Sequence, residues 1–241
     1  MKVSLFIPCL ADMFMPSAGE ATARLLARLG CEVEYPAAQT CCGQPAFNAG
    51  HWPEARKVAR QFLRAFSRSE IIVAPSGSCV SMVSNHYEKL FADAPAELEA
   101  ARALGARTFE LTEFIVKRLG ITEVGASFRA KVAYHDSCHL LRELGLRDEP
   151  RALLRGVTGL ELVELAESDR CCGFGGTFAI KFPEISAAMV RRKVERIKES
   201  GADTVVAGDP GCLINIKGRV HRAGLEVRVM HIAEVLAAGE K

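Results

Sequence analysis

The tripeptide Cys41-Cys42-Gly43 returns later in the chain as Cys171-Cys172-Gly173. A lone cysteine precedes each copy and another follows it, so that eight of the nine cysteines fall into two matching sets. The sets are Cys9, Cys41, Cys42 and Cys79, and then Cys138, Cys171, Cys172 and Cys212. Corresponding cysteines lie 129 to 133 residues apart, which predicts an internal repeat of half the chain.

Neighbouring cysteines are poorly placed to form a disulfide with each other. Adjacent α-carbons across a trans peptide lie about 3.8 Å apart, whereas an unstrained disulfide needs roughly 4.4 to 6.8 Å. We therefore expect both thiols of each adjacent pair to face one shared cofactor.

The composition is that of an ordinary globular protein. Of the 241 residues, 49% are hydrophobic and 25% are charged, with a net charge of +2, which is enough chain for two modest cores. Basic residues are spread along the sequence, and the run at 191–198 is interpreted as the solvated face of a helix, so no nucleic-acid surface is expected. The chain has no run of roughly 18 apolar residues, so no membrane-spanning segment is expected.

The start of the chain bears on the compartment. Residues 1–11 are apolar enough to resemble a signal peptide, but they contain Pro8 and Cys9 and no clear small-residue cleavage site follows. We therefore expect a cytoplasmic protein. In a reducing compartment, clustered cysteines are more often metal ligands or catalytic thiols than structural disulfides.

Short apolar, β-branched runs alternate with helical segments through both halves. Strands are expected at residues 3–7, 32–35, 71–74, 108–111, 131–134, 160–165, 204–207 and 227–230. Helices are expected between them, including 19–29, 53–67 and 183–200, with an additional helical excursion around Pro95. This alternation predicts an α/β protein of two repeated lobes, each a small parallel sheet flanked by helices. The predicted lobes are residues 1–122 and 129–241, with a joint at 120–129.

The cysteines follow the expected strands. Cys9 and Cys138 come directly after the first strand of each half, and Cys79 and Cys212 come soon after the third. Each adjacent pair follows the second strand. Because the carboxyl ends of parallel strands share one edge of a sheet, the four thiols of each half are expected to converge there.

Four converging thiolates suit a zinc ion or an iron–sulfur cluster. Structural zinc usually takes its ligands from close Cys-x-x-Cys pairs, whereas these cysteines come from three distant loops, which favours the wider iron–sulfur cluster. A metal-free thiol relay stays open as a third interpretation. Gly43 and Gly173 are candidate cofactor-binding residues, because glycine lets the backbone approach an anionic cluster and donate an N–H group.

The doubled pattern resembles the CCG family of cysteine-rich domains, which has a lone cysteine, Cys-Cys-Gly and a final cysteine in each half. This family includes the CCG-containing component of heterodisulfide reductase, the iron–sulfur subunits of glycolate oxidase and anaerobic glycerol-3-phosphate dehydrogenase, and lactate utilization protein A. The resemblance covers essentially the entire chain. It is strongest to the lactate-utilization branch, because the sequence has no ferredoxin-like Cys-x-x-Cys-x-x-Cys segment.

The resemblance implies an iron–sulfur electron-transfer subunit, with one cluster of 4Fe–4S or another type in each lobe. The complex would oxidise L-lactate, or a related 2-hydroxy acid, to pyruvate. Its partners would be a ferredoxin-like iron–sulfur subunit and a third lactate-utilization subunit, without which the chain is inactive. No catalytic residue is assigned. The alternatives are a zinc-stabilised interaction module, with zinc in one lobe, and a thiol–disulfide oxidoreductase of heterodisulfide-reductase type.

The sequence departs from the fullest family motif at two positions. That motif ends in Cys-x-x-Cys, but Ser76 and Asp209 stand at the penultimate positions here. Asp209 is included among the expected metal ligands because its carboxylate could bind iron. Either residue could instead cap a helix.

Three further residues have potential ligand atoms. Cys31 lies outside both sets, and its counterpart in the repeat is Leu160, so it is interpreted as a buried apolar residue. His135 and His139 flank Cys138. Ordinary loop histidines are expected there, with a role specific to the second site as the alternative. No Gly-x-Gly-x-x-Gly turn follows an expected strand, so no dinucleotide site is predicted.

Overall fold

The computed structural model describes residues 1–239, and positions 240 and 241 of the predicted second lobe lie outside it. Its frame is two four-stranded parallel sheets, in the strand orders β2-β1-β3-β4 and β6-β5-β7-β8. The first sheet contains β1 (Lys2–Leu5), β2 (Glu32–Glu34), β3 (Ile72–Ala74) and β4 (Thr108–Glu110). The second contains β5 (Ser127–Tyr134), β6 (Thr158–Val163), β7 (Thr204–Ala207) and β8 (Arg228–His231). The predicted α/β class and strands are confirmed.

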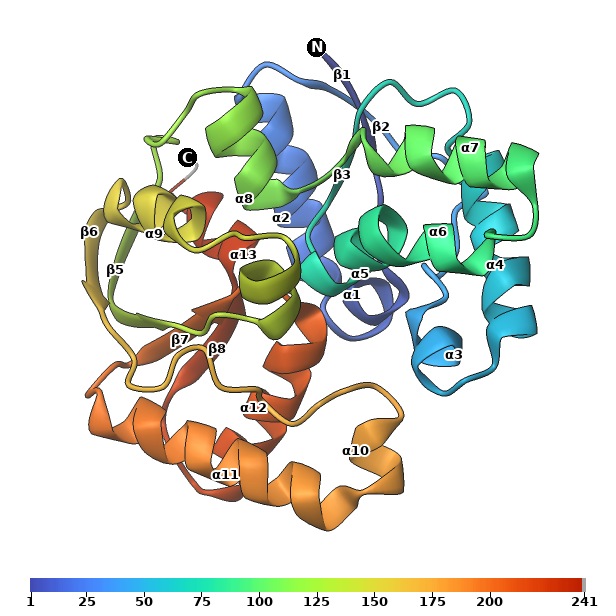
Figure 1. The fold of residues 1–241 in the computed structure, drawn as a ribbon. Helices are drawn as coiled ribbons and strands as arrows, with labels where there is room; N and C mark the ends of the chain where they lie inside the picture. Colours follow the sequence, from blue (N-terminus) through green and yellow to red (C-terminus); the bar gives the residue numbers. More distant parts are fainter. Residues whose placement is uncertain (240–241) are drawn as a thin grey trace.

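Helices flank the sheets in both halves (Figure 1). The first half has α1 (Cys9–Phe14), α2 (Pro16–Arg28), α3 (Gln44–Asn48), α4 (Trp52–Ala65), α5 (Gly77–Ser81), η1 (Met82–His86), α6 (Tyr87–Leu90), α7 (Pro95–Gly105), α8 (Leu111–Glu113) and η2 (Phe114–Arg118). The second has η3 (His139–Glu143), α9 (Asp148–Arg155), α10 (Phe178–Lys181), α11 (Pro183–Glu199), α12 (Pro210–Arg222) and α13 (Ile232–Leu236). The expected helices are present as α2, α4 and α11, and α6 and α7 form the excursion around Pro95. No helix within residues 1–239 has the length and apolar character needed to cross a membrane.

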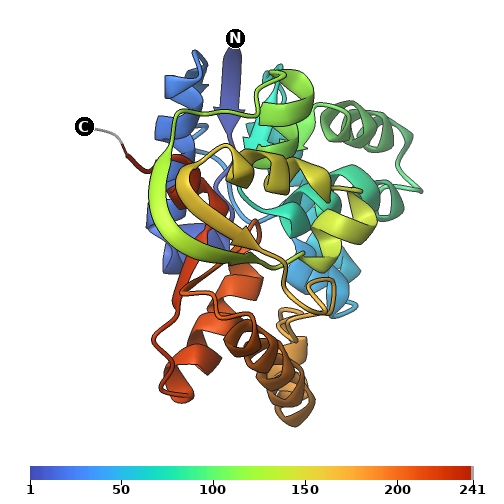
Figure 2. The same ribbon diagram turned by 90° about the vertical axis from the view of Figure 1, so that its left-hand side faces the viewer.

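Strand β5 starts earlier than the sequence predicts. It begins at Ser127, so that residues 127–129 of the expected joint belong to the second sheet. Ser127 pairs with Thr158 of β6, which lies beside β5 in Figure 2, and its N–H donates to the carbonyl of Ala238 at 3.2 Å. These partners come from distant parts of the chain, so the local pattern could not reveal this extension.

The largest apolar core joins the two halves. Leu25 and Phe114 of the first half pack in it with Val132 and Leu236 of the second, and α13 lies beside α2. Each half also has a core of its own, beneath α4 in the first and beneath α11 in the second. Each sheet takes its strands from one half of the chain, but apolar contacts connect the two halves. The lobe boundaries at 122 and 129 stay a prediction.

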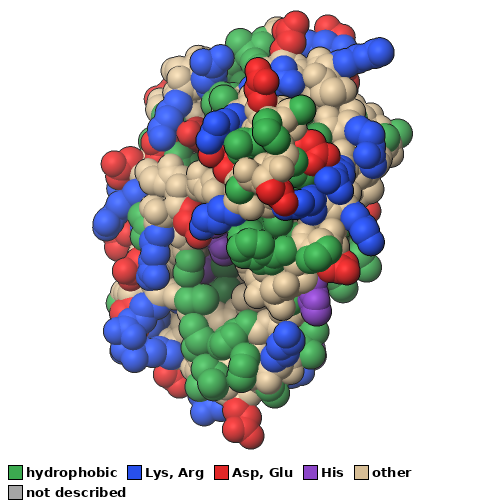
Figure 3. Space-filling model, turned by 45° about the vertical axis from the view of Figure 1, so that its right-hand side comes forward, with side chains coloured by type: hydrophobic (Ala, Val, Ile, Leu, Met, Phe, Trp, Pro, Cys, Tyr) green, Lys and Arg blue, Asp and Glu red, His purple; other side chains and the backbone are tan. Residues whose placement is uncertain are grey.

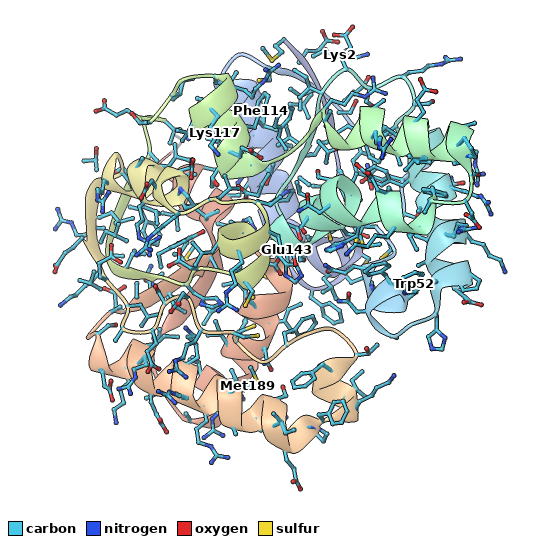
Figure 4. The ribbon with its side chains drawn as sticks, viewed as in Figure 1. Lys2, Trp52, Phe114, Lys117, Glu143 and Met189 are labelled. Atoms are coloured by element: carbon cyan, nitrogen blue, oxygen red, sulfur yellow. The ribbon has the colours of Figure 1, made fainter. Side chains whose placement is uncertain are left out.

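Polar contacts also connect the halves. Glu143 of η3 lies at the centre of the molecule (Figure 4), where its carboxylate accepts a hydrogen bond from Ser81 and lies 3.1 Å from Nε2 of His86. Lys117 of η2 pairs with Glu149 of α9 at 3.1 Å. The two lobes are therefore fixed to each other by charged groups as well as by the shared core.

Candidate metal centre

The first cysteine set gathers at the carboxyl ends of β1 and β3. Cys9 begins α1 after β1, Cys79 lies in α5 after β3, and the adjacent pair lies on the loop between β2 and α3. Sγ of Cys9 is 3.5 Å from Sγ of Cys41, and Sγ of Cys42 is 3.3 Å from Sγ of Cys79. Because β1 lies between β2 and β3, these loops meet where the strand order reverses, which is where open parallel sheets build their sites.

The second set repeats this arrangement. Cys138 follows β5 and directly precedes η3, Cys212 lies in α12 after β7, and the adjacent pair lies between β6 and α10. Sulfurs of Cys172 and Cys212 lie within 4.8 Å of each other, and all four cysteines of the set border the same cavity. The structure thus brings each predicted set of four together.

Both sets border one cavity between the lobes. Its volume is about 430 Å³, and its wall includes all eight cysteines of the two sets. A hollow surrounded by hydrophobic side chains is visible in Figure 3, and the exposed side chains of Phe14 and Ile180 contribute to the cavity wall. The two sites expected from the sequence are therefore neighbours around a common space.

Gly43 and Gly173 follow the adjacent cysteines in a left-handed conformation, with φ of 87° and 83°. The N–H of Gly43 donates to Sγ of Cys41 at 3.4 Å, and that of Gly173 donates to Sγ of Cys171 at 3.3 Å. A Cβ on Gly173 would lie 2.8 Å from the carbonyl oxygen of Ser186 in α11. The glycines therefore supply donors to the sulfurs, and Gly173 also lets α11 approach closely. Cofactor binding by these glycines stays a prediction.

In each set, the first cysteine of the adjacent pair has a pKa well below its ordinary value, and in the second set the pKa of Cys212 is also lowered, to about 6, first by its hydrogen bond with Cys172. Hydrogen bonding from neighbouring thiols, Cys42 first, lowers the pKa of Cys41 to about 3. In the second set, hydrogen bonding from Cys138 first lowers the pKa of Cys171 to about 2. The pKa of Cys42 is raised by its hydrogen bond to Cys41 and by burial. Like charges this close repel, so ionising all four thiols of a set requires a bound cation.

The sequences around these two centres match a known family. Residues 3–84 and 132–217 each match CCG, a cysteine-rich domain. The chain belongs to the CCG family. Each matched segment contains one complete cysteine set and the strands and loops that position it.

Relatives match this CCG protein over nearly its entire length. Lactate utilization protein A of Halalkalibacterium halodurans is 51% identical over 241 residues, covering 100% of this chain and 98% of the relative. The protein of that name from Bacillus subtilis is 50% identical over 236 residues, covering 98% of this chain and 99% of the relative. Among solved structures, glutamate racemase from Francisella tularensis has a TM-score of 0.37 at 10% identity, covering 98% of this chain and 78% of that chain, which is too remote to support an argument.

Ser76 and Asp209, where the CCG motif lacks its additional cysteine, both cap helices. Oγ of Ser76 accepts the N–H of Cys79 at 3.5 Å at the start of α5. Oδ1 of Asp209 accepts the N–H of Gly211 at 3.1 Å at the start of α12, and Oδ2 accepts that of Ser78 at 2.8 Å. The capping alternative is thus realised at both positions. A carboxylate has further lone pairs, and iron ligation by Asp209 stays a prediction.

The two histidines of the second CCG domain have different surroundings. His135 is fully buried after β5, and its Nδ1 lies 3.0 Å from the carbonyl oxygen of Ser168. His139 begins η3, and its Nε2 lies 3.3 Å from Nε2 of Gln44 in the first domain. His135 makes the ordinary hydrogen bond that the sequence favoured, but it also faces two sulfurs of the second set.

Lys193 is an exception to the interpretation of residues 191–198 as a solvated face. It is 2% exposed, and its Nζ donates to the carbonyl oxygens of Glu167 and, at 3.2 Å, Ser168. Helical spacing turns it inward with Val190, Val194 and Ile197. The same spacing is visible in the sequence and could have predicted that Lys193 is buried. The sequence-based interpretation followed the positive charge of residues 191–198 instead. The buried ammonium holds the loop that leads to the second cysteine pair.

Cys31 lies away from both sets. It is 7% exposed and belongs to the core that joins the lobes. Burial raises the pKa of its thiol. The prediction that Cys31 is a buried apolar residue is confirmed.

Proposed function

We propose that this chain is an iron–sulfur electron-transfer subunit of a cytoplasmic complex that oxidises L-lactate, or a related 2-hydroxy acid, to pyruvate. Relatives at 50% and 51% identity have the name lactate utilization protein A. The observation that carries the proposal is the convergence of eight thiols on one cavity. Thiolate ligands delivered by separate loops are typical of iron–sulfur proteins.

Each lobe would hold one cluster, of 4Fe–4S or another type. Its ligands would be the four cysteines of that lobe, with Asp209 as a further ligand in the second, and the N–H groups of Gly43 and Gly173 would support the thiolates. The donor chemistry of the residues fits such a group, because crowded thiols need a cation once ionised and the cavity beside them has room for more than one ion. A bound cluster supplies reversible one-electron transfer. The protein shields part of the ligand set from water, since Cys42 is 1% exposed and Cys172 is 2% exposed.

The stoichiometry of lactate oxidation suits two such centres. Conversion of lactate to pyruvate releases two electrons and two protons. Two one-electron centres in one chain can carry the two electrons to a ferredoxin-like iron–sulfur subunit, while a third subunit completes the complex. The chain would therefore be inactive without these partners.

The sulfur contacts favour a second candidate, a zinc-stabilised interaction module. A tetrahedral zinc ion with Zn–S bonds of about 2.3 Å holds its sulfurs roughly 3.8 Å apart. The contacts at 3.3 and 3.5 Å in the first set are close to this spacing. A cluster would require the sulfurs to stand further apart than they do in this arrangement.

The low pKa values of Cys41 and Cys171 support a third candidate, a thiol–disulfide oxidoreductase. Thiolates are the reactive form of cysteine in such enzymes. This candidate requires activity with a dithiol in the absence of metal.

Metal analysis separates the three candidates. Protein purified without oxygen should be brown, with several irons and acid-labile sulfides per chain and an electron paramagnetic resonance (EPR) signal after reduction. A colourless preparation with full zinc occupancy would contradict the proposal and support the zinc module. Metal-free protein that reduces a disulfide would support the third candidate. If iron is present, lactate oxidation by the reconstituted complex should disappear when this chain is left out.

A further inference from the structure

The two CCG domains differ at one buried position that lies three residues before the lone cysteine. It is Phe6 in the first domain and His135 in the second. The N–H of Phe6 donates to the carbonyl of Val73 in β3, and that of His135 donates to Val206 in β7, each at 2.9 Å. Identical strand pairing makes the two positions structurally equivalent. Phe6 packs edge-on against Phe62 at 4.9 Å between ring centroids, in an apolar core.

One nitrogen of the His135 imidazole contacts a backbone carbonyl, and the ring also interacts with the thiol of Cys212. Nδ1 lies 3.0 Å from the carbonyl oxygen of Ser168, which can only accept, so Nδ1 carries the hydrogen. In the neutral ring this leaves a lone pair on Nε2. Nε2 is buried and has no hydrogen-bond partner among the nitrogen and oxygen atoms of residues 1–239. A buried ring nitrogen without a nitrogen or oxygen partner is uncommon, and the groups beside this ring are thiols.

The ring of His135 lies beside the second cysteine set. A ring nitrogen of His135 and the sulfurs of Cys172 and Cys212 lie within 4.8 Å of one another. No corresponding nitrogen exists in the first domain, where the equivalent side chain is the phenyl ring of Phe6. The donor sets of the two sites therefore differ by an imidazole.

The orientation of the ring is fixed by the loop that leads to the second cysteine pair. The carbonyl of Ser168 accepts from Nζ of Lys193 at 3.2 Å as well as facing Nδ1 of His135. Metal-binding histidines commonly donate their second ring N–H to a backbone carbonyl, which fixes the tautomer and the direction of the free nitrogen. His135 has this arrangement.

We propose that Nε2 of His135 is a protein ligand of the second metal site, in addition to the four cysteines and Asp209 of that lobe. The first site would then have cysteine ligands without histidine. The inference rests on the proposed function in taking the bound group to be an iron–sulfur cluster. Because the ligand set tunes the potential of an iron–sulfur centre, the second site would have a reduction potential different from that of the first.

The test is pulsed EPR on the intact chain, purified without oxygen and reduced. Electron spin echo envelope modulation should detect an imidazole nitrogen coupled to one of the two clusters, and labelling histidine with ¹⁵N should change that coupling. His135→Phe gives the second domain the residue of the first. It should abolish the coupling, shift the potential of the second site and leave the spectrum of the first site unchanged.

His139→Asn is the matched control, because it removes the other imidazole beside Cys138 and should keep the coupling. A coupling that survives in His135→Phe, or that is absent from wild-type protein containing both clusters, would overturn the inference. If His135→Phe does not fold, the same coupling is measured in His135→Gln, where it should also be absent, and is compared with that of wild-type protein.

The test of His135 as a ligand can be distinguished from the test of the proposed function. Iron-loaded protein without any role in lactate oxidation would contradict the function and leave the coupling result standing. Zinc-loaded protein would contradict the cluster, and zinc X-ray absorption would then show histidine scattering that is lost in His135→Phe. Histidine scattering that persists in His135→Phe would contradict the assignment of His135 as a ligand.

Discussion

Oδ2 of Asp209, in the second lobe, accepts the backbone N–H of Ser78, in the first lobe, at 2.8 Å. The other oxygen of the same carboxylate caps α12 through the N–H of Gly211. Ser78 is the neighbour of Cys79 in α5, and α12 contains Cys212. One buried side chain thus connects the starts of two helices, and each of these helices contributes a cysteine from a different set.

Asp209→Ser should lower the stability of the protein by about 1 to 3 kcal/mol, because the shorter side chain keeps the helix cap but loses the charged hydrogen bond to Ser78. Anaerobic urea unfolding followed by circular dichroism measures the effect. A changed spectrum of the second cluster would show that Asp209 is also a ligand. A spectrum that changes at unaltered stability would contradict the bridging role.

Gly77→Ala should be destabilising by about 1 to 3 kcal/mol, because a Cβ at Gly77 would lie 1.8 Å from Cδ1 of Leu140 in the opposite lobe. Gly218→Ala is the matched control in α12. A Cβ there meets nothing within 4 Å, so alanine should stabilise the helix by roughly 0.5 to 1 kcal/mol. Equal melting temperatures for the two variants would show that the lobes do not approach as closely as described.

Arg151→Met should be destabilising by about 3 to 5 kcal/mol, because it leaves the carboxylate of Asp136 buried and unpaired. Both guanidinium NH₂ groups of Arg151 donate to this carboxylate at 2.7 Å, and the two side chains are 6% and 2% exposed. Arg155→Met removes a 63% exposed arginine of the same helix and should change stability little. Similar unfolding midpoints for the two variants would argue against a buried ion pair.

Glu110 should make stability fall as pH rises from about 4.5 to 7. Burial raises the pKa of this carboxyl from 4.5 to about 7, so between these values the folded protein keeps a proton that the unfolded chain has released. The resulting stability is fully present below pH 4.5 and is lost as pH rises through 7. Relative to Glu110→Gln, wild-type protein should lose up to roughly 3 kcal/mol across this range. Urea unfolding of both proteins at several pH values measures the difference, and parallel pH profiles would contradict it.

Cys42→Ala should empty only the first site, and Cys172→Ala only the second, each leaving about half of the bound iron. Cys31→Ala should keep all of it, since this thiol lies in the core. Iron analysis and EPR of the folded variants provide the measurement. If either single replacement removes all metal from a folded chain, the eight cysteines form one shared centre.

The sequence predicted the features that depend on short stretches of chain. The β-branched runs located strands such as β7 (Thr204–Ala207) at their observed bounds, and the spacing of the cysteines predicted their convergence. It did not predict the start of β5, because Ser127 joins the sheet through Thr158 and Ala238, which are remote in sequence. The orientation of the His135 ring was not predicted either, because it depends on the contact with the carbonyl oxygen of Ser168, which is also remote in sequence.

The core shared by the lobes was also beyond the sequence pattern. Periodicity shows that a helix face is apolar, but it does not show which partner covers that face. The apolar side of α2 is covered by α13, from the opposite end of the chain. A repeat read from the sequence therefore suggested two independent cores, and packing between the repeats produced an additional common one.

The common cavity also determines how oxygen inactivates the protein. Thiolates oxidise in proportion to their accessibility, and all eight cysteines of the two sets share one cavity wall. Oxygen or peroxide that reaches one set has entered the space that borders the other. Oxidation should therefore affect the cysteines of both centres together. A chain with one oxidised centre and one intact centre should be rare.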